Sequence, residues 1–135
     1  MSTKQIQVLV VEDDTSSAQA ARMMLERLGC QIQVADNGAE AIELFRAGEY
    51  DLILMDWQMP VMDGFEATAR IRNLAEGRTI PIVGTTARMS RNECLAAGMN
   101  DLIPKPFLLK SLRLALSRWT TWVEDVQARS TAEAN

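Results

Sequence analysis

Short apolar runs alternate with helix-forming segments five times along this chain, and this alternation restricts the fold more than any other feature. The runs are Ile6–Val11, Ile32–Val34, Leu52–Met55, Pro81–Gly84 and Leu102–Ile103. Each is too short for a helix and is followed by a segment with helical features. Strands that alternate with helices form a parallel sheet covered on both faces. The sequence therefore predicts an α/β fold with a single doubly wound, five-stranded parallel sheet.

The chain is the size of one domain. Its 135 residues fall near the roughly 150 residues typical of a domain, and no internal repeat or linker divides them. We expect one folded domain over residues 1–127. Residues 128–135 are expected to be a frayed tail, because their composition is simple and polar.

Composition excludes several classes of function. The chain has no His, which excludes a Ser-His-Asp triad and His-ligated zinc or haem. Its formal net charge of −4 argues against direct nucleic-acid binding. Two Cys cannot form a disulfide framework, and neither a signal sequence nor a membrane-length apolar run is present. These features predict a cytoplasmic protein without a membrane segment.

Polar residues follow the predicted strands where ligands bind in parallel sheets, beyond the carboxyl ends. The set comprises Glu12, Asp13, Asp56, Thr86 and Lys105. A group of carboxylates without His or Cys favours a hard cation such as Mg²⁺. Because Mg²⁺ usually binds only one or two carboxylates, it leaves room for phosphate oxygens as further ligands. A lysine and a hydroxyl suit those oxygens, and the candidate nucleophile is the carboxylate of Asp56. The residues thus predict a Mg²⁺-dependent aspartyl phosphorylation site.

Some assignments stay open at this point. Thr85 is the alternative to Thr86, because a shift of one residue turns a strand side chain to the other face. Trp57 is expected to border the acidic pocket, with core packing as the alternative. Three further acids, Asp14, Asp36 and Asp63, are expected to cap helices rather than bind metal.

Four segments in order resemble the receiver domain of two-component response regulators. They are VLVVEDD (8–14), LILMDWQMPVMDG (52–64), PIVGTTA (81–87) and AAGMNDLIPKPF (96–107). The resemblance implies a flavodoxin-like sheet of order 2-1-3-4-5 and a cis Lys105–Pro106 bond. It also implies that Glu12 and Asp13 hold Mg²⁺ and that Asp56 accepts the phosphoryl group. By the same resemblance the backbone carbonyl of Gln58 ligates the metal, Thr86 is the switch hydroxyl and Lys105 binds phosphate.

Two departures from the family pattern concern signalling rather than chemistry. Leu102 stands where the family usually has Tyr or Phe, so the usual aromatic readout must be altered or lost. The stretch from Thr86 to Lys105 is also short by about three residues, roughly one helical turn. We therefore expect only a short helix there, over Asn92–Ala97.

The predicted function is that of a phosphorelay receiver rather than an enzyme. The resemblance implies a phosphoryl donor on a histidine kinase or histidine phosphotransfer protein, and a downstream protein partner. Self-phosphorylation with Mg²⁺ and slow autodephosphorylation are the only expected catalysis. The alternatives are an interaction adaptor that works without phosphorylation and an Asp-nucleophile phosphatase. The phosphatase would carry a second Asp where Gln58 stands.

The final helix is predicted to be long. Leu109, Leu112, Leu116, Trp119, Val123 and Val126 keep a three- to four-residue spacing. Its distal part, with Trp119, Trp122 and Val126, is expected to expose an apolar patch that could support a homodimer. The alternative is a helix folded back onto its own domain.

Overall fold

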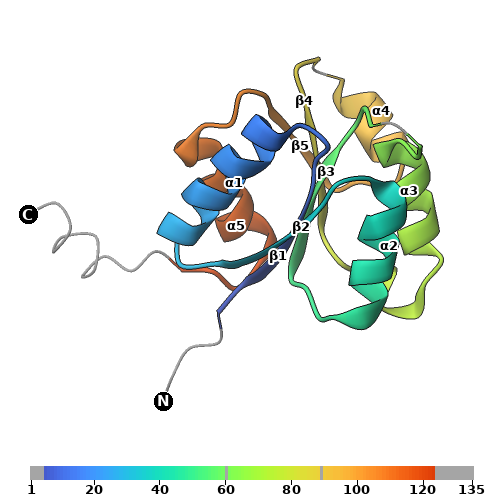
Figure 1. The fold of residues 1–135 in the computed structure, drawn as a ribbon, viewed down its shortest axis with the longest axis horizontal. Helices are drawn as coiled ribbons and strands as arrows, with labels where there is room; N and C mark the ends of the chain where they lie inside the picture. Colours follow the sequence, from blue (N-terminus) through green and yellow to red (C-terminus); the bar gives the residue numbers. More distant parts are fainter. Residues whose placement is uncertain (1–4, 60, 89, 124–135) are drawn as a thin grey trace, which may run out of the picture.

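The computed structural model describes residues 5–59, 61–88 and 90–123 as five strands and their connecting helices (Figure 1). The elements, in order, are β1 (Gln7–Val11), α1 (Thr15–Arg27), β2 (Gln31–Ala35), α2 (Gly38–Ala47), β3 (Leu52–Asp56), α3 (Gly64–Arg72), the 3-10 turn η1 (Ala75–Gly77), β4 (Ile82–Thr86), α4 (Arg91–Ala96), β5 (Asp101–Pro104) and α5 (Leu109–Trp119). The strands pair in parallel in the order β2-β1-β3-β4-β5. The predicted doubly wound sheet and its 2-1-3-4-5 order are confirmed. Within the described ranges, none of the helices combines the length and hydrophobicity that a bilayer span requires.

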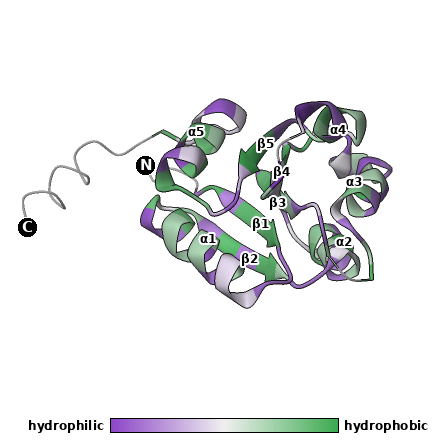
Figure 2. Cartoon of the chain, turned by 90° about the horizontal axis from the view of Figure 1, so that it is seen from above, coloured by the Kyte–Doolittle hydropathy of each residue, from purple (hydrophilic) through white to green (hydrophobic). Residues whose placement is uncertain are grey.

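Helices α1 and α5 cover one face of the sheet, and α2, α3 and α4 cover the other (Figures 1 and 2). Side chains alternate between these two faces along each strand, because successive strand residues point in opposite directions. On β1, Val8 and Val10 pack toward α1 and α5, whereas Leu9 and Val11 pack on the opposite side. All five residues of β3 are buried, as expected for a central strand that helices cover on both faces.

Polar caps begin the first three helices. Asp14 accepts a hydrogen bond from the Ser17 backbone N–H at 2.8 Å, and Asp63 accepts one from Glu66 at 2.9 Å. Both predicted caps are confirmed.

The prediction for Asp36 is wrong, because the next residue caps α2. Asn37 accepts a hydrogen bond from the backbone N–H of Glu40 at 2.9 Å. The Glu40 carboxylate in turn accepts one from the backbone N–H of Asp36, also at 2.9 Å. The arrangement differs from a capping box, in which the Glu40 carboxylate would accept from the backbone N–H of the cap residue Asn37 itself. Asp36 therefore contributes its backbone N–H rather than its side chain.

The fourth helix is short, as predicted. It spans only Arg91–Ala96, and Gly98 follows it in the left-handed conformation, with φ of 96°. The shift of one residue from the predicted start is within the ordinary uncertainty of helix ends.

The prediction of a long final helix is wrong. Helix α5 ends at Trp119, since Thr120 is extended at φ −133° and ψ 179°. The Thr120 hydroxyl bonds to the Leu116 carbonyl at 2.6 Å, and the following chain turns back onto the domain. The Trp122 indole N–H donates to the Leu28 carbonyl at 2.8 Å.

Consequently Trp119 and Trp122 pack against the core beneath α1 and α5 instead of forming an exposed patch. The alternative, a C-terminal segment folded back on its own domain, is therefore correct for these two residues. Val126 and the predicted frayed tail, residues 128–135, lie outside the described residues.

Candidate functional site

Three carboxylates meet beyond the carboxyl ends of β1 and β3. Glu12 and Asp13 follow β1 directly, and Asp56 is the last residue of β3. Each offers a carboxylate oxygen, and these oxygens all lie within 4.8 Å of one another. Glu12 and Asp56 are buried, whereas Asp13 is exposed. The parallel pairing of β1 with β3 brings together acids that are more than 40 residues apart in the sequence.

Lys105 enters this cluster from the end of β5. Its ammonium lies 3.2 Å from Oδ1 of Asp56 and forms an ion pair with Oε1 of Glu12. The Lys105 backbone N–H donates to the Thr86 carbonyl at 2.9 Å, which fixes the approach of the lysine. The Lys105–Pro106 peptide bond is cis, as the family resemblance implies.

Burial is the largest influence on the pKa values of Glu12 and Lys105 in the cluster. Burial, followed by the hydrogen bond with Asp56, raises the pKa of Glu12 from 4.5 to about 7. Burial alone would lower the pKa of Lys105, but its contacts with Glu12 and Asp56 outweigh burial and raise it. Lys105 therefore stays protonated. The three clustered carboxylates favour the binding of a further positive charge beside them.

The loop after β3 folds closely around Asp56. The Gln58 backbone N–H donates to Oδ1 of Asp56 at 3.3 Å, and the Gly64 N–H donates to the Trp57 carbonyl at 3.1 Å. A Cβ atom on Gly64 would lie 2.1 Å from the Asp56 carbonyl oxygen. Gly64 thus permits a close approach that positions Asp56. The sequence pattern predicts only that Asp63 caps a helix, and no local pattern indicates the approach of Gly64 to Asp56.

Two threonines end β4 beside the cluster, and both are buried. Thr85 pairs in register with Asp56, whereas Thr86 pairs with Pro104, next to Lys105. The Thr86 hydroxyl accepts a hydrogen bond from the Arg88 backbone N–H at 3.0 Å, which leaves its own proton free to donate. The structure therefore keeps both threonines near the site.

Trp57 does not border the acidic pocket, and that prediction is wrong. Its ring is 3% exposed and belongs to the core on the α2, α3 and α4 side of the sheet. The ring centroid lies 5.0 Å from that of Phe65. A Cβ atom on Gly84 would lie 2.3 Å from the indole nitrogen, so the missing side chain on β4 makes room for the ring. Strand alternation turns Trp57 inward, away from the face that Asp56 occupies.

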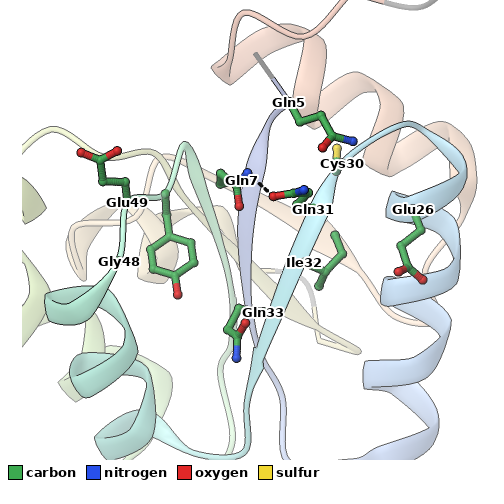
Figure 3. A pocket seen from close by; sticks show the side chains of 10 residues that line it. Gln5, Gln7, Glu26, Cys30, Gln31, Ile32, Gln33, Gly48 and Glu49 are labelled. Atoms are coloured by element: carbon green, nitrogen blue, oxygen red, sulfur yellow. Dashed lines mark hydrogen bonds between the residues drawn. The ribbon is translucent and has the colours of Figure 1, made fainter. Parts of the chain in front are cut away.

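Two hollows lie near β2, and only one adjoins the acids. A hollow of about 220 Å³ is lined by Glu12 and Asp13 together with residues of α1 and the end of β2. A wider one of about 560 Å³ lies at the start of β1 and β2, between Gln5, Cys30 and Gln33 (Figure 3). None of the clustered residues lines the wider hollow, so its larger size does not make it the candidate site. The site is identified by its charges instead.

One buried acid with many partners was not predicted. Asp101, at the start of β5, accepts hydrogen bonds from Arg91 of α4 at 2.9 Å and from Arg118 of α5 at 3.1 Å. The Trp119 indole N–H is a third side-chain donor, at 3.0 Å. These donors are up to 18 residues away in the sequence, so no local pattern marks Asp101.

The donor set of the acidic cluster fits a hard divalent cation. Carboxylate oxygens are the ligands that Mg²⁺ prefers, and it needs only one or two of them. Lys105 and a threonine hydroxyl are then available for the oxygens of a phosphoryl group. The arrangement can hold a cation, a phosphoryl group and a carboxylate nucleophile together.

Residues 8–117 match the family described as the response regulator receiver domain. The chain belongs to this family. A receiver domain is a signalling module rather than an enzyme that turns over a substrate. Hybrid signal transduction histidine kinase G of Dictyostelium discoideum is 42% identical over an aligned length of 125 residues, and the match covers 87% of this chain and 4% of that kinase. This receiver domain thus spans a small part of the curated relatives that it matches.

Solved receiver structures agree with the fold. The receiver domain of sensor histidine kinase PA1611 from Pseudomonas aeruginosa PAO1 is 37% identical, with a TM-score of 0.80 over 86% of this chain and 98% of that one. That structure has a magnesium ion coordinated in its active site cleft. A chain in the co-crystal structure of the Saccharomyces cerevisiae phosphotransfer protein Ypd1 with the Ssk1 receiver domain is 29% identical, with a TM-score of 0.80 over 90% of this chain and 94% of that one.

Proposed function

We propose that Asp56 accepts a phosphoryl group from a phosphohistidine on a partner protein. The observation that carries this proposal is the contact of Lys105 with Asp56 inside the cluster formed with Glu12 and Asp13. An oxygen of Asp56 bonds to phosphorus, and the phosphorus–nitrogen bond of the donor breaks. The electron pair of that bond returns to the imidazole nitrogen, which takes a proton from solvent.

Each residue around Asp56 has a separate task in this proposal. Lys105 neutralises a phosphoryl oxygen with its ammonium group, and Thr86 donates its hydroxyl hydrogen to another. Glu12, Asp13, Asp56 and the carbonyl of Gln58 would hold Mg²⁺, which supplies positive charge to the transferring group when bound. The buried acids favour this ion because it offsets their mutual repulsion.

Phosphorylation of this kind acts as a signal. It adds nearly two negative charges at a buried site and biases the arrangement of the neighbouring loops and helices. Self-phosphorylation from a small donor and slow autodephosphorylation would be the only catalysis. Because Leu102 is buried and has no ring or hydroxyl, we expect the readout to differ from the usual aromatic one.

The donor that fits best is a histidine kinase or a histidine phosphotransfer protein, because this chain has no His of its own. A downstream protein partner would read the phosphorylated state, with no direct role for nucleic acid.

A cytoplasmic location suits the two free, buried cysteines. The receiver limits of residues 1–127 are part of the proposal. In the described part of the chain, two of the side chains on which the predicted homodimer depended, Trp119 and Trp122, pack against their own domain.

The decisive experiment is incubation with acetyl phosphate and Mg²⁺, followed by intact-mass measurement. The wild-type chain should gain one phosphate that base or hydroxylamine removes. Asp56→Asn should gain none while its circular dichroism stays unchanged. Asp63→Asn, in the same loop, is the matched control and should be phosphorylated normally. A phosphate retained in Asp56→Asn would mean that another residue is the acceptor.

The metal assignment has its own test. Asp13→Ala should weaken Mg²⁺ binding, measured by calorimetry, because it removes a carboxylate from an ion that takes few. Asp14→Ala is the control, since Asp14 caps α1 and is not part of the cluster. An equal loss of Mg²⁺ affinity in both variants would contradict the assignment of Asp13 as a ligand.

A further inference from the structure

Strand β2 has one open side. Within the described residues it pairs with β1 alone. At its start Gln31 donates its N–H to the residue before β1 at 2.9 Å, and at its end the Ala35 carbonyl accepts from the residue after β1 at 3.0 Å. The ladder bonds of a parallel pair come from alternate residues of a strand. The backbone N–H and C=O groups of Ile32 and Val34 therefore point away from the sheet, as on any edge strand.

This edge lacks the side chains that usually keep an edge strand from pairing, which are charged residues and Pro. Strand β2 reads QIQVA, and all five residues pair with β1 in unbroken register, without a bulge. On one face of the sheet Gln31 and Gln33 are exposed, and on the other Ile32 and Val34 are half-buried. The edge thus offers an added strand one row of amides and one row of branched apolar side chains.

Carboxylates lie at the amino end of this edge. Glu26 of α1 and Glu49 after α2 both line the wider hollow, one on each side of the paired strands β1 and β2 (Figure 3). Both side chains are exposed. Among the described residues that line this hollow there is no Lys or Arg. A strand laid along β2 would therefore meet uncompensated negative charge at this end.

We propose that the open edge of β2 binds an extended segment of a partner protein, which carries Lys or Arg where it meets Glu26 and Glu49. The segment would add a strand to the sheet through the outward backbone groups of Ile32 and Val34. Its apolar side chains would pack on those two residues, and its cations would lie beside the two carboxylates. The wider hollow is at the opposite end of the sheet from Asp56, so this docking is separate from the phosphorylation site.

A second copy of this chain fits the edge less well than a basic partner does. Two-fold pairing of β2 with β2 is antiparallel, so the amino end of one strand meets the carboxyl end of the other. The smaller hollow, at that carboxyl end, is lined by three acids and one Arg. Glu26 and Glu49 of one copy would thus approach acids of the other. Residues 5–67 as a whole contain 12 Asp and Glu and 3 Arg, which also favours a basic partner.

The test uses the full 135-residue chain labelled with ¹⁵N and a synthetic peptide of alternating Val and Thr with two Lys at each end. The backbone amides of Ile32 and Val34 should shift and exchange more slowly with solvent, because they gain main-chain hydrogen bonds. The same peptide with Glu for Lys should bind at least about tenfold more weakly. Equal binding of the Glu peptide, or shifts confined to other elements, would overturn the proposal.

Substitutions in the chain separate charge from main-chain bonding. Glu26→Gln and Glu49→Gln should each weaken binding about threefold, whereas the exposed control Glu76→Gln should not. Ile32→Pro removes an outward N–H. It should bind the peptide at least about fivefold more weakly than Ile32→Ala, which keeps that N–H. Equal binding of the Pro and Ala variants would contradict strand addition, and unchanged binding in both Gln variants would contradict the role of the carboxylates.

If Ile32→Pro does not fold, the peptide supplies the same contrast. Successive residues of a strand point their N–H groups to opposite sides, so Pro at two adjacent central residues always removes one donor to β2. This peptide should bind at least about fivefold more weakly, and unweakened binding would contradict strand addition. Sedimentation of the chain without peptide tests the other occupant. Self-association, with concentration-dependent shifts at Ile32 and Val34, would overturn the proposal in favour of a second copy.

Discussion

The Lys105 ammonium forms an ion pair with Glu12 although the two residues are 93 positions apart in the sequence. The same ammonium also contacts Asp56 at 3.2 Å. One cation thus forms ion pairs with two buried carboxylates. Burial nevertheless raises the pKa of Glu12 to about 7.

This raised pKa makes the stability of the metal-free domain depend on pH. The folded state binds the Glu12 proton more tightly than the unfolded chain does. The protonated carboxyl of Glu12 therefore adds to the free energy of unfolding below the unfolded pKa of 4.5, and this stabilisation is lost as the pH rises through about 7. The loss amounts to at most about 3 kcal/mol. Glu12→Gln should remove this pH dependence of stability. Urea unfolding in the presence of a chelator, at about pH 5 and about pH 8, measures it. Glu66→Gln, on the exposed face of α3, should keep the wild-type dependence. The same pH dependence in Glu12→Gln and wild type would contradict the assignment.

The switch hydroxyl can be identified by paired substitutions. Thr86→Ala should slow phosphorylation by acetyl phosphate about tenfold or more, because one donor to the phosphoryl group is lost. Thr86→Ser should restore the rate. Thr85→Ala should leave it near the wild-type value. A slow Thr85→Ala with a normal Thr86→Ala would reverse the assignment of the two hydroxyls.

Gly64 should be intolerant of any side chain. A Cβ there would lie 2.1 Å from the Asp56 carbonyl oxygen, so Gly64→Ala should lower the free energy of unfolding by about 2 kcal/mol and slow phosphorylation. Gly29 is the control, because it has φ of 87° but nothing within 4 Å of its would-be Cβ. Gly29→Ala should cost only about 1 kcal/mol and leave the phosphorylation rate unchanged. A normal rate in Gly64→Ala would show that its approach does not position Asp56.

Val61 is a β-branched residue in the left-handed region, with φ of 72°, and it is 86% exposed. Val61→Asn should raise the free energy of unfolding by about 1 kcal/mol, because Asn tolerates this conformation better. Val61→Thr keeps the β-branch and should give no gain. Thermal unfolding of the three proteins makes the comparison, and equal melting temperatures would mean that the conformation stores no strain.

Trp122 should contribute to stability rather than to association. Trp122→Ala removes a half-buried ring and its hydrogen bond to the Leu28 carbonyl, so we expect a loss of about 2 kcal/mol. Val123→Ala, at a neighbouring residue that is 83% exposed, should change stability by less than about 0.5 kcal/mol. Sedimentation should show no change in oligomeric state for either. Altered association in Trp122→Ala would revive the predicted docking role of the C-terminal segment.

Local chemistry was sufficient to predict much of this receiver domain from its sequence. Apolar runs located the strands, and Asp14 and Asp63 cap helices as expected, because a cap bonds a backbone group only three residues away. The convergence of Glu12, Asp13 and Asp56 followed from the rule that parallel strands end at a common edge. The prediction that Asp36 caps α2 failed because the side chain of its immediate neighbour, Asn37, makes the capping hydrogen bond instead.

The sequence by itself determined the sheet, the helix starts and the identity of the clustered acids, since these depend on residue type and on neighbours along the chain. Only the tertiary structure decided where the large rings and the distant ion pairs lie. Trp57 is buried because Gly84, on another strand, leaves space for its ring. Helix α5 stops at Trp119, and Trp122 reaches back to Leu28 rather than continuing the apolar stripe. Such contacts depend on the volume left between packed elements, and that volume is set by the whole fold rather than by any local pattern.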